Sequence, residues 1–185
     1  AAVKVHWGEP GNTTYIAVPF VRTLCDLVKK GGARPFVTDT NTLYAGMRHD
    51  AIANLQAAAF DGFTMETVGA PIIVADGLCG TDFVPVPVAG KHVKEAKIAS
   101  AIARATALLV VSHFKGHMLF SFGGALKNLG MGCATSAGKQ TLHSDVRPRV
   151  DRAACTGDSI CVRHCPERCI ALDADHKAVI DPSRC

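Results

Sequence analysis

The segment Pro71-Ile72-Ile73-Val74-Ala75-Asp76 is a short apolar run followed by a carboxylate, and it is the clearest indication of the fold class. Continuous apolar runs of this length are typical of strands buried on both faces of a parallel sheet. The segment Ala107-Leu108-Leu109-Val110-Val111 is a second run of this kind. Strand-like segments also lie at residues 3–7 and 35–39.

Segments with helical spacing of apolar residues separate these strands. One begins at Val18 and stops at Gly31, and another begins at Ala51 and stops near Asp61. Strands that alternate with helices are typical of parallel sheets covered by helices on both faces. The sequence therefore predicts an α/β fold over residues 1–150: a three-layer domain with a mostly parallel sheet.

The middle of the chain predicts smaller elements. Residues 83–88 and 93–99 flank Gly90 and predict a hairpin, whose first arm lies at an edge because of its prolines. We expect a short helix over residues 101–105 and a further helix that opens within residues 123–129.

Composition limits the function classes. The 185 residues carry a net charge of +4 without a block of like charge, so no nucleic-acid partner is expected. No apolar run reaches the roughly 18–20 residues that span a bilayer, and the N-terminus does not resemble a signal peptide. Both ends are abrupt, which predicts a fragment. A metal site of thiolates, argued below, predicts a cytoplasmic protein.

Polar residues follow the ends of the predicted strands. In open α/β sheets, the crevice beyond the carboxyl ends of the strands is the usual ligand site. We therefore expect a small-ligand or cofactor site here, and for each residue alone the stabilisation of a turn is an equal alternative. The candidates are Gly8, Glu9, Asn12, Asp39, Asn41 and Asp76.

A second group follows the strand at residues 107–111. His113, Lys115 and His117 come first, and Gly123, Gly124 and Lys127 lie at the predicted helix start. The backbone amides of Gly123 and Gly124 with a lysine beside them suit an anion or cofactor, and the histidines suit a metal or proton transfer. The candidate catalytic residues are therefore His113, Lys115, His117 and Lys127. The alternative is that the glycines only permit close packing and the histidines are ordinary loop residues.

Five of the eight cysteines fall within residues 155–185, which favours a metal site over a disulfide framework. Cys155, Cys161 and Cys165-Pro166 match positions one, three and four of the bacterial ferredoxin pattern C-x2-C-x2-C-x3-C-P, and Asp158 holds position two. Residues 151–185 therefore predict the first half of a two-cluster 4Fe-4S ferredoxin module, a truncated α+β unit. Cys185 stands where the second motif would begin.

Asp158 leaves alternatives open. Asp158 ligates iron, or the site loses one iron and holds a three-iron cluster, or Asp158 is solvated and Cys169 is recruited instead. For the whole cysteine cluster, the alternatives are a zinc site or inert thiols.

Several segments of the chain carry a resemblance to a known family. They are residues 5–13, 38–44, 75–77, 112–117 and, most specifically, Gly123-Gly124-Ala125-Leu126-Lys127-Asn128-Leu129-Gly130-Met131-Gly132-Cys133. In these segments the chain resembles the iron–sulfur proteins that carry domain of unknown function 362. The resemblance implies an α/β domain fused to a two-cluster ferredoxin module, with cysteine at the position of Asp158, and it supplies no reaction.

Three functions remain open from the sequence. The favoured one is a redox protein that moves single electrons through its clusters, while the α/β domain binds a small-molecule substrate or a redox partner protein. The second is an enzyme whose chemistry lies between His113 and Lys127, with structural or regulatory clusters. The third is a scaffold that carries clusters to other proteins.

Overall fold

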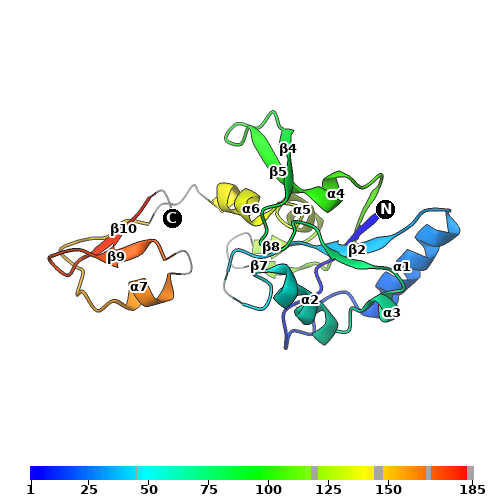
Figure 1. Cartoon of the computed structure of the whole chain (residues 1–185), viewed down its shortest axis with the longest axis horizontal. Coiled ribbons are helices and arrows are strands. Elements are labelled where there is room, and N and C mark those ends of the chain that lie inside the picture. Colours follow the sequence, from blue (N-terminus) through cyan, green and yellow to red (C-terminus); the bar gives the residue numbers. More distant parts are fainter. Residues whose placement is uncertain (45, 118–120, 144–147, 166–167, 183–185) are drawn as a thin grey trace. The chain divides into compact units, whose positions relative to one another are not determined.

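The computed structural model describes residues 1–44, 46–117, 121–143, 148–165 and 168–182. The chain divides into two compact units, an N-terminal unit of residues 1–142 and a C-terminal unit of residues 143–185 (Figure 1). The assignment of a boundary near residue 150, with a ferredoxin module after it, stays a prediction. No helix among the described residues is long and apolar enough to cross a membrane.

The N-terminal unit is built on a parallel four-stranded sheet with the order β3-β2-β1-β6. Every neighbouring pair is parallel, and Val3 of β1 lies opposite Val37 of β2 and Leu109 of β6. The structure therefore confirms the predicted α/β fold with a mostly parallel sheet. The strands are β1 (Ala2–Lys4), β2 (Phe36–Asp39), β3 (Ile72–Val74) and β6 (Leu108–Val110).

Three helices pack on one face of this sheet (Figure 1), and these are α1 (Val18–Lys30), α2 (Ala51–Phe60) and α3 (Met65–Val68). Val21 and Cys25 of α1 are buried in one apolar cluster with Val3 and Val37 of the sheet. Cys25 is therefore a core residue. Local sequence fixes the start of α2, since the Asp50 carboxylate caps it by accepting from the amide of Ala53 at 2.9 Å.

The opposite face of the sheet is covered by α4 (Ser100–Ala103) and α5 (Ala125–Gly130). Lys4 alternates with Val3 along β1, and its ammonium reaches Asn128 of α5, which shows that β1 contacts helices on both faces. A second apolar cluster on this side contains Ile102 and Cys133. The three predicted layers are therefore present.

The predicted edge hairpin is also present. Strands β4 (Phe83–Pro87) and β5 (Glu95–Ala99) pair antiparallel, with Pro85 opposite Lys97. The sequence did not predict the hairpin of β7 (Lys115–His117) and β8 (Ser121–Gly123) or the helix α6 (Ser136–His143).

In the described part of the C-terminal unit there is one short helix and one hairpin. Helix α7 spans Ile160–His164, and strands β9 (Ile170–Leu172) and β10 (Ala178–Ile180) pair antiparallel. Gly157 adopts a φ of +72° and passes so close to the hairpin that a Cβ there would lie 2.5 Å from the His176 carbonyl oxygen. Glycine is therefore required where the cysteine-bearing loop meets the hairpin.

Candidate functional site

A buried group of charges lies at the carboxyl ends of β1 and β2. The Asp39 carboxylate is 2.7 Å from the Lys4 ammonium through Oδ1 and 2.6 Å from the Arg48 guanidinium through Oδ2. All three side chains are at most 3% exposed. Burial alone would raise the pKa of Asp39, but Lys4 and Arg48 outweigh it and hold that pKa well below its usual range. Asp39 is therefore an anion that two cations neutralise.

Arg48 extends this group toward the surface. Its Nη1 donates to Glu9 Oε1 and to His6 Nδ1, both at 3.1 Å, and the Tyr44 hydroxyl donates to Glu9 Oε1 at 2.6 Å. His6 Nδ1 also lies 3.4 Å from Asp39 Oδ2, but the contact with Arg48 is shorter, and a guanidinium only donates, so Nδ1 of a neutral imidazole is assigned as the acceptor and Nε2 as the N–H donor. The His6 side chain is 46% exposed and that of Glu9 is 33% exposed. The solvent-facing side of the group thus offers an N–H donor and a carboxylate.

A second polar group lies between β2, β3 and α6. The backbone amide of Asn41 donates to Asp76 Oδ1 at 2.9 Å. Lys139 Nζ donates to Thr40 Oγ1, to the Asn41 carbonyl and to the Ala134 carbonyl at 2.6, 2.7 and 2.7 Å. Burial lowers the pKa of Lys139 to about 8 and raises the pKa of Asp76.

Asn54 joins the two groups into one hydrogen-bonded cluster. Its Oδ1 accepts from Arg48 Nε at 3.3 Å and from Trp7 Nε1 at 3.0 Å. Its Nδ2 donates to Asn41 Oδ1 at 3.1 Å. We call this cluster the sheet-edge network; its members are Lys4, His6, Glu9, Asp39, Thr40, Asn41, Tyr44, Arg48, Asn54, Asp76 and Lys139.

The structure brings together four of the six predicted ligand residues at this edge. Glu9, Asp39, Asn41 and Asp76 belong to the sheet-edge network, but the last three are buried, so of the four only Glu9 presents its side chain to solvent. Asn12 stabilises a local turn by accepting from the Thr14 amide at 2.7 Å. Gly8 has a φ of +96°, and a Cβ there would lie 2.6 Å from the Tyr15 ring.

The sequence missed most of the network's cations. Lys4, Arg48 and Lys139 were not candidates, because their importance depends on partners far away in the chain. One signal was available. Lys4 lies between the apolar residues Val3 and Val5 of a predicted strand. The Gly-rich motif around Asn128 is explained by Lys4, since Asn128 Oδ1 accepts from its ammonium at 2.7 Å.

The other candidate group lies on the β7–β8 hairpin and α5. The Lys127 ammonium contacts His117 Nε2, and a Cβ at Gly123 would lie in ordinary contact with Lys127 and Lys115. Burial, with Lys115 next, lowers the pKa of Lys127, and burial, with Lys127 next, lowers that of His117. The structure therefore gathers Lys115, His117 and Lys127.

Three features distinguish this second group from a preformed anion site. His113 is exposed in the loop before β7, and Gly124 precedes a helix of only six residues. The ring of Phe114 lies 3.4 Å from the position of a Cβ on Gly124.

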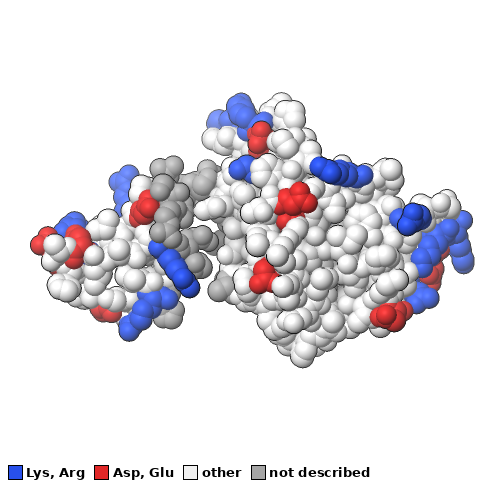
Figure 2. Space-filling model, viewed as in Figure 1, with Lys and Arg blue, Asp and Glu red and all other residues white. Residues whose placement is uncertain are grey.

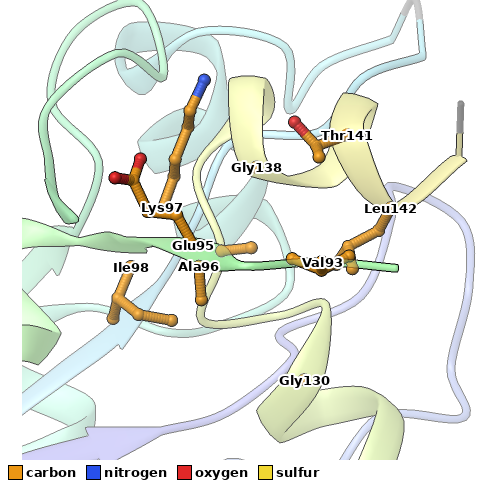
Figure 3. Close-up of a pocket in the computed structure, with 10 residues that line it drawn as sticks. Val93, Glu95, Ala96, Lys97, Ile98, Gly130, Gly138, Thr141 and Leu142 are labelled. Atoms are coloured by element: carbon orange, nitrogen blue, oxygen red, sulfur yellow. The ribbon is translucent and has the colours of Figure 1, made fainter. Parts of the chain in front are cut away.

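The N-terminal unit also contains a small hollow. It has a volume of about 80 Å³ and lies between β5 and α6, where Ile98, Val93 and Leu142 line it (Figure 3). Ligand pockets commonly measure about 300–1,000 Å³. No predicted site residue lines the hollow, so it gives no support to a ligand site.

Charged side chains elsewhere are interspersed. Figure 2 shows Lys and Arg together with Asp and Glu over the helices at one end of the N-terminal unit. On α1, Asp26 accepts from Arg22 at 2.9 Å and lies 3.7 Å from Lys29. Pairs of this exposed kind contribute little to stability or recognition.

The thiols of the C-terminal unit are the candidate metal donors. Cys155 Sγ accepts the Ala178 amide at 3.4 Å, and this bond, the Gly157 amide and then Lys177 lower the pKa of Cys155. Cys161 is exposed, whereas the sulfurs of Cys165 and Cys169 lie 3.5 Å apart. Cys185 lies outside the described residues.

Among the described residues, no three His, Cys, Asp or Glu side chains are gathered as a metal-binding group. Ligands of small metal domains commonly come together only as the metal binds, so the chemistry of the donors is the relevant test of fit. The four described thiols of this unit, one of them favoured as a thiolate by backbone amides, suit iron–sulfur chemistry.

The fold and the sheet-edge network define an α/β protein whose polar groups converge at the carboxyl ends of parallel strands. The chain belongs to the family described as Domain of unknown function (DUF362), whose model matches residues 1–176. No curated protein and no solved structure gave a match. The family assignment confirms the resemblance based on the Gly-rich motif, while the fused ferredoxin module stays a prediction.

Proposed function

We propose that the C-terminal unit is an iron–sulfur module of the 4Fe-4S ferredoxin type that passes single electrons. The N-terminal unit then binds the small molecule or partner protein that exchanges those electrons. The observation that carries the proposal is the environment of Cys155, whose sulfur accepts a backbone amide and whose pKa is lowered. These are the conditions that favour a thiolate ligand.

Each part of the C-terminal unit has a role in this proposal. When bound, the cluster supplies one-electron transfer. The β9–β10 hairpin presents the Ala178 amide to the Cys155 sulfur, and hydrogen bonds of this kind tune the potential of iron–sulfur centres. Lys177 donates to the Cys155 carbonyl at 2.6 Å and fixes the loop that carries the sulfur.

The sheet-edge network supports the role proposed for the N-terminal unit. Its buried members hold Arg48 rigidly, and Arg48 in turn positions His6 and Glu9 at the surface. An imidazole N–H donates and a carboxylate accepts, so the pair can bind a small polar molecule that has both a hydrogen-bond acceptor and a hydrogen-bond donor. The buried residues Asp39, Asn41 and Asp76 would position this surface without touching the ligand.

The test is metal analysis of the whole chain purified without oxygen. We expect iron and acid-labile sulfide in similar amounts and a visible absorbance that bleaches when dithionite is added. A colourless protein, or one that holds zinc alone, would contradict the proposal.

A second candidate function is an enzyme whose chemistry lies at Lys115, His117 and Lys127. The contact between Lys127 and His117 supports it, because the two nitrogens are within reach of each other and the pKa of each is lowered from its ordinary value, as burial and neighbouring lysines require. Titration with inorganic phosphate tests the anion site: Lys127→Met should abolish binding, and Lys91→Met, an exposed control, should not. Equal binding by both variants would refute this candidate.

A further inference from the structure

Asp158 occupies the position where the ferredoxin pattern has a ligand, yet its carboxylate is already engaged in local structure. Oδ1 accepts the Ile160 amide at 3.0 Å, and Oδ2 accepts the Thr156 hydroxyl at 2.9 Å. The Ile160 amide, then Thr156, lowers the pKa of Asp158. Both oxygens therefore hold the turn that opens α7, as aspartates at helix starts commonly do.

Cys169 lies outside the ferredoxin spacing, but the fold directs its sulfur to a predicted ligand. The Arg168 amide donates to the Cys165 carbonyl at 3.1 Å, and Arg168, the residue before Cys169, has a φ of +49°. The Cys169 carbonyl accepts the Asp181 amide at 2.8 Å, which anchors Cys169 at the end of the β9–β10 hairpin.

The resulting sulfur–sulfur distance is that of neighbouring metal ligands. Cys165 Sγ and Cys169 Sγ are 3.5 Å apart. Two thiolates on one tetrahedral metal, with metal–sulfur bonds near 2.3 Å, lie about 3.8 Å apart, whereas a disulfide needs about 2.05 Å. Cys169 is also 6% exposed, so a metal bound there is shielded from water.

We propose that Cys169 ligates the metal beside Cys165 and that Asp158 is a structural residue. This inference rests on the proposed function of the C-terminal unit. It assigns the site four thiolates, from Cys155, Cys161, Cys165 and Cys169, and therefore a preference for iron or other thiophilic metals over hard cations.

Cobalt(II) added to the metal-free whole chain tests the inference without relying on activity. Sulfur-to-cobalt charge-transfer absorbance reports the number of thiolate ligands. We expect Cys169→Ser to lower this absorbance by about a quarter, one thiolate in four, and to lower iron retention. Asp158→Asn, which keeps the Oδ1 acceptor, and Cys79→Ser, an exposed cysteine of the other unit, should match the wild type.

Circular dichroism of the metal-free variants controls for folding. Should Cys169→Ser fail to fold, alkylation of the wild type in mild denaturant, mapped by mass spectrometry, gives the same answer: cobalt should protect Cys169. If the wild type binds cobalt, Cys169→Ser binds it with the same absorbance and Asp158→Asn loses it, then this inference is wrong. The proposed function would not be affected by that result. A wild-type chain that binds neither iron nor cobalt would overturn the proposed function as well.

Discussion

At the scale of single residues, Asp39 is the anion on which the sheet-edge network depends. Lys4 and Arg48 are nearly inaccessible to water, and each has a direct contact with this carboxylate. Removing one member of a buried ion pair leaves an uncompensated charge, which costs far more than losing a surface pair.

We expect Asp39→Asn to lower the free energy of unfolding by about 3–5 kcal/mol. Asp26→Asn on the exposed face of α1 is the matched control and should change it far less. Urea titrations of both variants measure the difference. Equal stability of the two variants would show that the network is dispensable.

The same residue predicts a pH dependence. The folded-state pKa of Asp39 lies below the unfolded value near 3.9, so its contribution is complete above that pH. The contribution is lost as the pH falls toward the folded pKa. The stability gap between wild type and Asp39→Asn should therefore narrow below about pH 4. A constant gap in urea titrations down to that range would contradict the assignment.

Lys139 provides a spectroscopic prediction. Its pKa of about 8 lies below the usual value of about 10.4. Between these values the unfolded chain binds more protons, so this group makes the fold more stable as the pH rises from 8 toward 10.4. Carbon-13 NMR of the lysine ε-carbons should show a signal, absent in Lys139→Met, that titrates near pH 8, below the ordinary lysine range.

At the scale of elements, the turn at Gly157 places the cysteine-bearing loop against the β9–β10 hairpin. Gly157→Ala would place a methyl group against the His176 carbonyl and force an unfavourable φ. Substitutions at such positions cost more than about 1 kcal/mol. We expect the variant to retain less iron than the wild type, whereas Gly116→Ala, with open space around it, should retain the same amount. Iron content after desalting distinguishes them.

The elements also show how far the sequence alone leads. Helices α1 and α2 were predictable because their apolar residues recur with helical spacing, the buried strands because they are continuous apolar runs, and the β4–β5 hairpin because its two arms flank Gly90. The β7–β8 hairpin was missed because its strands are short, glycine-rich and largely exposed. Glu9 and Asp39 were found from their place after strands, but Arg48, which joins them, follows no strand and shows its role only through long-range contacts.

At the scale of the whole molecule, the two compact units predict separate responses to metal. Iron should slow amide hydrogen exchange in the C-terminal unit, above all at Ala178 and Gly157, because metal binding is coupled to local folding. Amides of β1 and β2 should exchange at unchanged rates. Exchange measured by mass spectrometry, before and after removal of iron by a chelator, makes the comparison. Slowed exchange in both units alike would contradict independent responses.

The prolines of β4 have a consequence for self-association. The Val88 amide donates to the Lys94 carbonyl, and the Asp82 carbonyl accepts the Ser100 amide. The backbone N–H and C=O groups of the even-numbered residues of β4 therefore point toward β5. Pro85 and Pro87 therefore point their nitrogens outward, where neither can donate a hydrogen bond. An incoming strand would find no donor at either position, so this edge resists the strand-by-strand addition that seeds amyloid-like aggregates.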